Sequence, residues 1–376
     1  MQNFLSYNTN ELYMILASWD QPSWRARQIC EWVWQRGATD YAEMSNLPQA
    51  LRERLAAELP LQRATVAERL QGCDGARKYL LRFADGVSVE TVGIPDTGGG
   101  PGADGARLTV CVSSQAGCAL GCVFCATGRQ GLTRNLSSGE IAEQVRVVGA
   151  DFGRAVTNVV VMGQGEPFAN YDATLDALRL LNSPQGFNIG ARHLTVSTSG
   201  IITGIDRLAS EPEQFRLAIS LHSATQELRD TLMPGLRAQT LEKLQEALIR
   251  YRELSGRRVS LEYILLRDVN DRDSDLCALA DFARATRAHI NLLPYNEIGS
   301  ESTKQASEPG KTSVGRVDPD APPLEATPGK KLVMAVESEA RTRQAADLLR
   351  AAGVETSIRR SRGADIAAAC GQLAGA

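Results

Sequence analysis

Three cysteines lie on one short stretch of the chain at the spacing Cys118-x3-Cys122-x2-Cys125. Thiolates so close together can bind three irons of a 4Fe–4S cube and leave the fourth iron without a protein ligand. An electron carrier needs four cysteines, whereas an open iron can chelate the amino and carboxylate groups of S-adenosylmethionine (SAM). Reductive cleavage of SAM at such a cluster produces a 5′-deoxyadenosyl radical. The spacing therefore predicts a radical enzyme whose cofactors are a 4Fe–4S cluster and SAM.

A structural zinc site is the alternative interpretation of the same cysteines. Such sites usually combine paired Cys-x2-Cys motifs, or cysteine with histidine. The chain contains only His193, His222 and His289, and none of them lies near the triplet. Cys111 is a possible fourth ligand, so zinc stays open as the less favoured interpretation.

The bulk composition is that of a globular protein without a general affinity for nucleic acid. Of the 376 residues, 43% are hydrophobic and 23% are charged, and the formal net charge is −3. Any RNA contact must therefore come from local basic patches. Eight cysteines in a chain of this length suit a reducing compartment. No apolar run reaches membrane-spanning length, and Met1-Gln2-Asn3 lacks the charged start of a signal peptide, so we expect a cytoplasmic location and no membrane partner.

The first hundred residues show helical and then hairpin patterns. Apolar residues recur at helical spacing, so residues 1 to about 75 are expected to be helical. Residues 78–94 predict a β-hairpin around the turn pair Asp85-Gly86. Residues 96–106 are rich in Gly, Pro and Asp and predict a connector.

From residue 107 onward, strand patterns alternate with amphipathic helical patterns. About six βα units imply a parallel sheet, either an open barrel or a doubly wound sheet, with the site at the carboxyl ends of the strands. Residues 299–330 are polar and without periodicity, which indicates a long inserted loop. The expected strands are 108–112, 158–162, 193–197, 216–220, 259–265, 290–293 and 354–360, and the expected helices include 138–149, 171–181, 240–254 and 339–352.

Several motifs, taken in their order along the chain, closely resemble the RlmN/Cfr family of radical-SAM RNA methyltransferases, and specifically its RlmN branch. The resemblance covers nearly the whole chain. The cysteine triplet alone marks a very large superfamily, whereas the ordered set is highly specific. The matching segments are Trp24–Ile29, Asn46–Pro48, Val110–Gln115, the cysteine loop, Gly128–Gly131, Met162–Pro167, Ser197–Gly200, Ser220–His222 and Ala369–Leu373.

The resemblance implies a fold and a division of the chain. The fold class would be α/β, a partial (βα)6 TIM-like radical-SAM barrel with a small N-terminal helical domain and a β-hairpin extension. Residues 1–75 would form an RNA-binding accessory domain, and residues 76–106 the hairpin and connector. Residues 107–376 would form the radical-SAM core with the insertion 299–330 and a C-terminal catalytic tail.

The resemblance also implies a mechanism that uses two SAM molecules and two thiols outside the triplet. A methyl group is first placed on the cysteine that matches Cys370, because the amidine carbon of adenine is a poor nucleophile. The radical abstracts a hydrogen from this S-methyl group, and the resulting methylene radical adds to the ring. The position of Glu90 matches the base that removes the ring proton. Cys111 matches the cysteine that closes a disulfide and releases the product.

The remaining implied site residues bind cofactors. Cys118, Cys122 and Cys125 would be the cluster ligands. Glycine at position 165 would let the chain approach SAM closely. The positions that match SAM contacts are Gly165, Glu166, Ser197, Ser220, Leu221, His222 and Asn296.

The implied product is C2-methyladenosine in 23S rRNA and in tRNA, at the adenosine 3′ of the anticodon. An external electron donor such as flavodoxin would reduce the cluster, and a monomer would suffice. The alternatives are a Cfr-type C8 methyltransferase of 23S rRNA and a non-catalytic RNA-binding factor with a structural metal. The segment 233–237 and the loop 299–330 depart from the family pattern and are candidate RNA contacts. The candidate arginines for RNA are Arg25, Arg27, Arg52, Arg54, Arg129, Arg134, Arg359, Arg360 and Arg362.

Overall fold

One mixed sheet organises the chain. The computed structural model describes residues 3–96, 107–298 and 334–375. Within these residues a ten-stranded sheet runs in the order β1-β2-β3-β4-β7-β8-β9-β10-β11-β12. The loop expected at 299–330 lies outside the described residues, as does most of the connector expected at 96–106.

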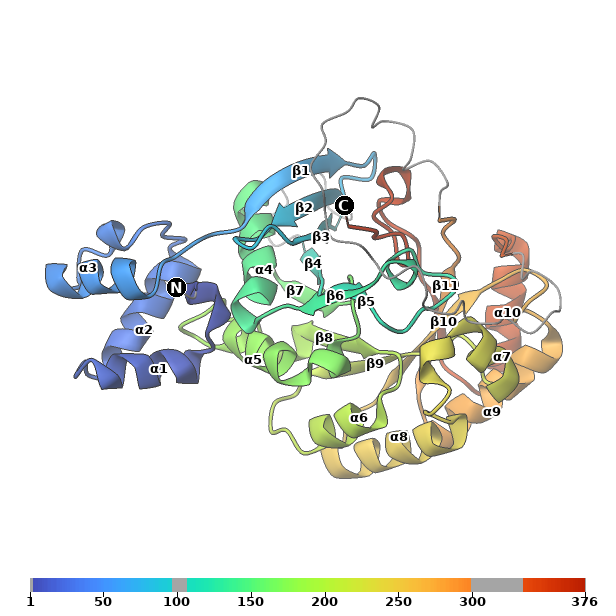
Figure 1. Cartoon of the computed structure of the whole chain (residues 1–376). Coiled ribbons are helices and arrows are strands. Elements are labelled where there is room, and N and C mark those ends of the chain that lie inside the picture. The colour runs from blue at the N-terminus through green and yellow to red at the C-terminus, as the bar shows by residue number, and fades with distance from the viewer. Residues whose placement is uncertain (1–2, 97–106, 299–333, 376) are drawn as a thin grey trace, which may run out of the picture.

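The N-terminal residues form a small helical group at one end of the molecule (Figure 1). It contains α1 (Thr9–Ser18), α2 (Trp24–Cys30) and α3 (Gln49–Glu58). A capping box between Asn8 and Glu11 begins α1. The expectation of helix up to about residue 75 is wrong, because Thr65–Gln71 form strand β1. Antiparallel pairing with β2 satisfies the backbone of this mostly exposed strand, whose mixed composition gives little strand signal.

The hairpin prediction is confirmed and extended. Strands β2 (Arg77–Arg82) and β3 (Ser88–Pro95) pair antiparallel across the turn at Asp85-Gly86, where Gly86 has a φ of 86°. Strand β1 joins on one side of this hairpin. On the other side, β3 pairs antiparallel with β4 (Leu108–Val112) and so joins the hairpin to the main sheet.

The second part of the sheet is parallel and confirms the α/β radical-SAM fold. Strands β4, β7 (Asn158–Val161), β8 (Leu194–Thr198), β9 (Arg216–Ser220), β10 (Ser260–Leu265), β11 (His289–Pro294) and β12 (Thr356–Ile358) follow one another in parallel. The pairing of β12 with β11 adds one parallel strand to the six expected units in the described part of the chain.

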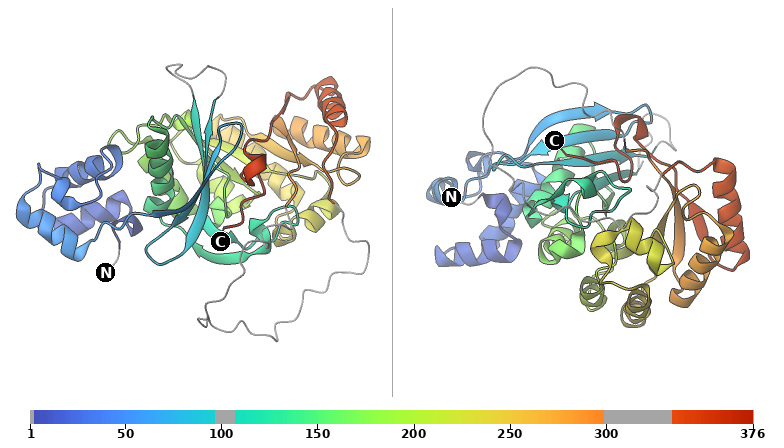
Figure 2. Two further views of the ribbon diagram at one scale, coloured as in Figure 1. Left: turned by 90° about the horizontal axis from the view of Figure 1, so that it is seen from above. Right: turned by 45° about the vertical axis from the view of Figure 1, so that its right-hand side comes forward.

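Helices cover the outer face of the curved sheet (Figure 2). They are α4 (Ser138–Phe152), α5 (Tyr171–Asn182), α6 (Ile202–Ala209), α7 (Gln226–Leu232), α8 (Leu241–Ser255), α9 (Asp273–Thr286) and α10 (Glu339–Ala351). Along β8, Leu194, Val196 and Thr198 are buried, whereas Thr195 and Ser197 are half-buried. Because alternate side chains of a strand point to opposite faces, the second set lines the interior of the barrel.

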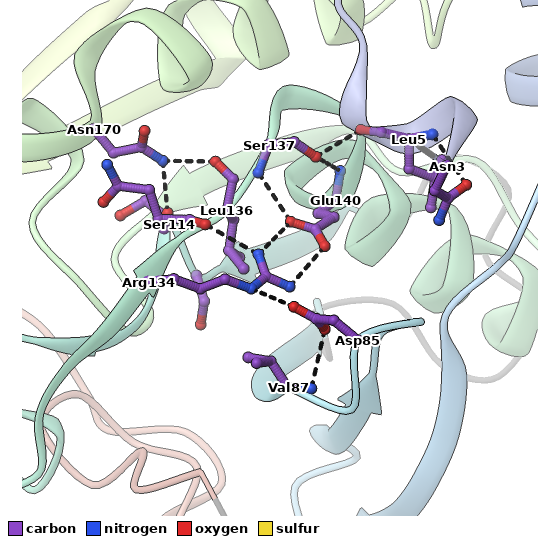
Figure 3. Close-up of polar contacts among 12 residues, drawn as sticks. Asn3, Leu5, Asp85, Val87, Ser114, Arg134, Leu136, Ser137, Glu140 and Asn170 are labelled. Carbon is purple, nitrogen blue, oxygen red and sulfur yellow. Dashed lines mark hydrogen bonds and ion pairs between the residues drawn. The ribbon is translucent and has the colours of Figure 1, made fainter. Parts of the chain in front are cut away.

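A two-stranded sheet of β5 (Gln115–Cys118) and β6 (Gly131–Asn135) begins and ends the segment that carries the cysteines. The Arg134 guanidinium on β6 binds the carboxylates of Asp85 and Glu140 and so ties the hairpin turn to the start of α4 (Figure 3). This arginine was a candidate RNA contact, but its donors are used within the protein. The sheet was not predicted, because Gln115–Cys118 contains no β-branched residue.

Short helical turns complete the structure. They are the 3-10 turns Phe4–Ser6, Tyr41–Glu43, Thr127–Arg129, Pro167–Asn170, Ala191–His193, Pro234–Leu236 and Ala364–Ile366, and the π turn Glu31–Gln35. Among the helices of the described residues, none has the length and apolar character that a bilayer span requires.

Candidate active site

The cysteine triplet lies at the carboxyl ends of the parallel strands, as the sequence predicted. All three residues line one cavity of about 140 Å³, which we call the cluster cavity. Cys118 and Cys122 are buried and Cys125 is half-buried. Among the described residues, no three His, Cys, Asp or Glu side chains lie so close that one metal ion could bind them all. A cube binds each thiolate at a separate iron, so its ligands need not converge on one point.

The loop that carries the cysteines packs against the segment after α7. Leu232 O accepts a hydrogen bond of 3.0 Å from Val123 N, and Leu120 O accepts one of 3.0 Å from Gly235 N. The segment 233–237, which departs from the family pattern, therefore begins against the cluster loop rather than on an open face. Burial raises the pKa of the Cys118 thiol to about 11 and raises that of Cys122 as well. Since iron binds thiolates, loading of a cluster has to displace these protons.

The turn after β7 requires glycine at position 165. Gly165 has a φ of +97°, and a Cβ atom there would lie 2.5 Å from Cβ of Gln115. The next residue, Glu166, is buried and its carboxylate accepts hydrogen bonds from Thr198 Oγ1 (2.6 Å), Ser199 N (2.7 Å) and Phe168 N (2.9 Å). Burial raises the Glu166 pKa, and these three bonds oppose that shift. The carboxylate is thus fixed in the wall of the cluster cavity.

Ser197, Ser220 and His222 extend the same wall from the ends of β8 and β9. The two serine hydroxyls lie 3.3 Å apart. His222 Nδ1 accepts a hydrogen bond of 3.1 Å from Ile264 N, so the ring proton is on Nε2. Burial and the nearby Arg229 guanidinium lower the His222 pKa to about 3, so the ring is neutral. A neutral imidazole with a free Nε2–H offers a hydrogen-bond donor to a ligand.

The C-terminal tail brings Cys370 to the cluster cavity. Gly371 O accepts a hydrogen bond of 2.7 Å from Ala126 N, and Leu373 O accepts one of 2.5 Å from Thr127 Oγ1. These bonds fix the tail on the cluster loop. Cys370 lines the cavity and keeps accessible surface, while desolvation by the surrounding protein raises its thiol pKa.

Cys111 is close to this tail but outside the cluster cavity. It lies on β4 and lines an adjoining cavity that Cys370 also lines. Burial raises the Cys111 pKa to about 12, and the charge of the Cys370 thiolate contributes to that shift. All eight cysteines of the chain are free thiols in this structure.

Besides Cys111, three implied site residues lie outside the lining of the cluster cavity. Asn296 lines the adjoining cavity and donates a hydrogen bond of 3.2 Å to Cys370 O. Leu221 is fully buried, and its backbone N–H donates to Glu262 O at 3.0 Å. Glu90 is buried on β3 and lines neither cavity.

Glu90 is held by an ion pair and by the tail. Lys78 Nζ lies 2.9 Å from Oε1 of Glu90. Oε2 accepts hydrogen bonds from the backbone N–H groups of Ala374 (2.7 Å) and Gly375 (3.2 Å). The candidate base is therefore connected to the segment that carries Cys370, and not exposed on the strand.

Known proteins resemble this chain along its whole length. Residues 112–280 match the family model of the radical SAM superfamily, and residues 2–60 match that of the ribosomal RNA large subunit methyltransferase N-terminal domain. A probable dual-specificity RNA methyltransferase RlmN of Gemmatimonas aurantiaca is 40% identical over 99% of this chain and 93% of its own length. This chain belongs to the RlmN family. A second RlmN, RlmN 3 of Opitutus terrae, is 42% identical over 94% of this chain and 89% of its own.

The fold of the RlmN-family chain also matches a solved structure. A radical SAM methyltransferase from Sphaerobacter thermophilus shares 41% identity with a TM-score of 0.82, over 99% of both chains. Membership of the radical-SAM superfamily implies SAM and a 4Fe–4S cluster as cofactors. The three thiols of the cluster cavity, with Glu166 fixed beside them, fit that pair of cofactors.

The sequence of this RlmN-family chain did not lead us to two charged residues of the site. Glu262 on β10 lines the cluster cavity, and its Oε2 is buried without a hydrogen-bond partner among the described residues. Lys78 binds Glu90 and donates to Ala367 O at 3.2 Å. An acid inside the apolar run 259–265 was the available signal for Glu262. Lys78 gave none, because lysine at a strand end is usually solvated.

Proposed function

We propose that this chain transfers a methyl group from SAM to C2 of adenosine in RNA, through S-methylated Cys370. The targets are 23S rRNA and tRNA, at the adenosine 3′ of the anticodon. The main support for this proposal is that Cys370 lines both the cluster cavity and the adjoining cavity, which Cys111 also lines. The printed names of the relatives, dual-specificity RNA methyltransferases, support the same activity.

The cofactors have defined places in this proposal. Cys118, Cys122 and Cys125 bind the cluster, which with bound SAM supplies the 5′-deoxyadenosyl radical chemistry. Glu166 and Gly165 hold the methionine amino group. The SAM site is completed by Ser197, Ser220 and His222 in the cluster cavity, and by Leu221 and Asn296 beside it.

The remaining residues move a methyl group and a proton. The Cys370 sulfur carries the methyl group to the ring. Glu90 Oε2 takes the ring proton once the amides of Ala374 and Gly375 have moved away from it. The Cys111 thiolate then attacks the Cys370 sulfur, so that the S–S bond forms as the bond from this sulfur to the bridging carbon breaks. That carbon takes a proton and becomes the methyl group of the released base, and the unpaired electron left by the radical addition would return to the cluster. Both thiols line the cavity that adjoins the cluster cavity, which supports this last step.

Each segment of the chain has its own role in the proposed reaction. The helical part of residues 1–75 assists RNA docking, residues 76–106 supply Glu90, and residues 107–376 carry the radical chemistry. The chain acts as a monomer, because one chain contains one complete set of site residues. It acts in the cytoplasm. An external donor such as flavodoxin reduces the cluster.

Mass spectrometry of the protein tests the first half of this reaction. Anaerobically reconstituted protein is incubated with methyl-labelled SAM and reductant, and the Cys370 peptide is analysed. A labelled methyl group on Cys370 is expected in the wild type and in Cys277→Ala, whose thiol is exposed on α9 away from the site. Absence of label from Cys370 in folded, cluster-loaded protein would contradict the proposal.

A further inference from the structure

A second cavity of about 340 Å³ opens at the amino end of the barrel, where most of the arginines that line it are exposed, and we call it the arginine cavity. Thr109, Asn158, Thr195 and Arg216, from the amino-terminal halves of β4, β7, β8 and β9, line it. The segment that follows β12 also lines it. The residues that line both this cavity and the cluster cavity are Met162, Leu293, Arg359, Cys370 and Leu373. The two cavities therefore meet at Cys370.

The strands divide the barrel interior between the two cavities. On β8, Thr195 lines the arginine cavity and Ser197 lines the cluster cavity. On β9, Arg216 lines the arginine cavity and Ser220 lines the cluster cavity. Because alternate residues of a strand share a face, each pair follows one line from the amino to the carboxyl end. The arginine cavity thus occupies the amino end of the barrel, opposite the cysteine triplet.

The arginine cavity is strongly cationic. No aspartate or glutamate belongs to the described residues that line it. Within the described parts of the chain, only Arg362 of its arginines forms an ion pair, 3.8 Å from Asp74. The arginines of the lining are Arg107, Arg192, Arg216, Arg359, Arg360 and Arg362.

Such a concentration of one charge favours an anion inside the cavity. A recess lined by like charges focuses their field and attracts counter-ions. Guanidinium groups present forked N–H donors that match the oxygens of a phosphate. Asn158 and His193, whose side-chain nitrogens lie 3.1 Å apart, add polar groups to the same wall.

The charges of the two substrates decide which of them this cavity suits. SAM carries an ammonium, a sulfonium and one carboxylate, so its net charge is positive and the arginines repel it. RNA is a polyanion. We propose that the arginine cavity admits the RNA strand, with its phosphates bound by Arg192 and Arg216, while the target base reaches Cys370. This inference rests on the proposed function and names the route by which its substrate enters.

Salt-dependent RNA binding tests the inference without catalysis. The variant Arg192→Gln/Arg216→Gln is compared with Arg284→Gln/Arg343→Gln, which makes the same charge change. Arg284 and Arg343 are exposed on the outer helices α9 and α10, where each pairs with an acid within one turn. The dissociation constant of a fluorescent RNA hairpin with an unpaired target adenosine is measured over a range of salt concentrations. Self-methylation of Cys370 is measured in parallel.

We expect the cavity variant to bind this RNA about tenfold more weakly near physiological salt. The slope of log Kd against log salt should fall by about 2, one for each lost phosphate contact, and the outer control should keep the wild-type slope. Cys370 self-methylation should be unchanged, because Arg192 and Arg216 line only the arginine cavity, whereas most of the proposed SAM site lines the cluster cavity. A normal melting curve establishes folding, and Arg107→Gln/Arg360→Gln replaces the first variant if it does not fold.

Wild-type RNA affinity and an unchanged slope of log Kd against log salt in the folded cavity variant would overturn the inference. Loss of self-methylation would also overturn it, because the arginines would then belong to the SAM site. Failure of the proposed function is distinguishable: wild-type protein would then form no methylated adenosine, whatever its RNA affinity.

Discussion

The backbone N–H of Ala374 donates a hydrogen bond of 2.7 Å to Oε2 of Glu90, a residue 284 positions earlier in the chain. The other oxygen of this carboxylate is paired with Lys78 at 2.9 Å. The same lysine donates to Ala367 O, three residues before Cys370. Lys78 thus connects the candidate base on β3 with the segment that carries Cys370. In the proposed mechanism, the tail has to leave Glu90 before its Oε2 can accept a proton from RNA.

Replacement of Lys78 by methionine should uncouple these two elements. The Lys78 and Glu90 side chains are 12% and 10% exposed, so the variant leaves a nearly buried carboxylate without its partner. We expect a loss of about 3 kcal/mol in the free energy of unfolding, measured with urea. RNA methylation should fall at least tenfold while Cys370 self-methylation persists, because the latter removes no ring proton. Lys78→Arg keeps the charge and should retain most of the stability and most of the RNA methylation. Unchanged stability and turnover in Lys78→Met would contradict this role.

Replacement of Cys111 by alanine should trap an intermediate. Without the second thiol no disulfide can form, so the link between Cys370 and the methylated base should persist. We expect a covalent protein–RNA species on a denaturing gel after one turnover with SAM and reductant. Cys277→Ala is the matched control and should release its product. Release of free methylated RNA by Cys111→Ala at the wild-type rate would show that Cys111 is not the resolving thiol.

Gly165→Ala should damage the SAM site through the backbone. The new Cβ atom would approach Gln115 Cβ to 2.5 Å, and φ at this position is +97°. We expect the free energy of unfolding to fall by about 2–3 kcal/mol and SAM binding to weaken. Gly153→Ala is the control, because its φ is +62° but nothing lies within 4 Å of the added atom; it should cost only about 1 kcal/mol. Equal losses in the two variants would show that the close approach to Gln115 is not limiting.

The buried His222 should make the protein less stable in acid. Its pKa is lowered from 6.5 to about 3 on folding, so between these values the unfolded chain binds a proton that the folded chain does not. The contribution to stability is complete above pH 6.5 and should decline by about 1.4 kcal/mol per pH unit as the pH falls toward 3.

His222→Asn isolates this effect from the titration of carboxylates. Asparagine tolerates the φ of +57° at this position and does not titrate. Urea unfolding of both proteins from neutral pH downward should therefore show their stability difference shifting in favour of the variant. A pH-independent difference would mean that His222 is not held neutral.

The parallel strands could be predicted because burial on both faces selects continuous apolar runs. Strand β9 has the expected bounds, and β7 and β8 differ from theirs by one residue. Strands β1 and β5 were not predicted, because their side chains give no strand pattern. Only the backbone hydrogen bonds to their partner strands show that they are strands. The cysteine spacing alone predicted the cluster site, since its three candidate ligands lie close together in the sequence.

Long-range contacts of the site could not be predicted in the same way. Glu90 resembles a solvated strand residue until the tail folds over it, and no local pattern records that contact. The charge of the arginine cavity was also hidden, because Arg107, Arg192 and Arg216 are far apart in the sequence. The parallel register places them together at the amino ends of neighbouring strands. Family resemblance made Glu90 a candidate base, whereas only the fold brings these arginines together.

Nucleoside mass spectrometry tests the central claim most directly. 23S rRNA and tRNA from a host that lacks the modification are incubated anaerobically with reconstituted protein, SAM and reductant, and Cys370→Ala serves as the control. We predict C2-methyladenosine in the wild-type reaction and none with the variant. C8-methyladenosine would assign the chain the Cfr-type reaction instead. Free 5′-deoxyadenosine without any methylated adenosine would contradict the proposed substrate.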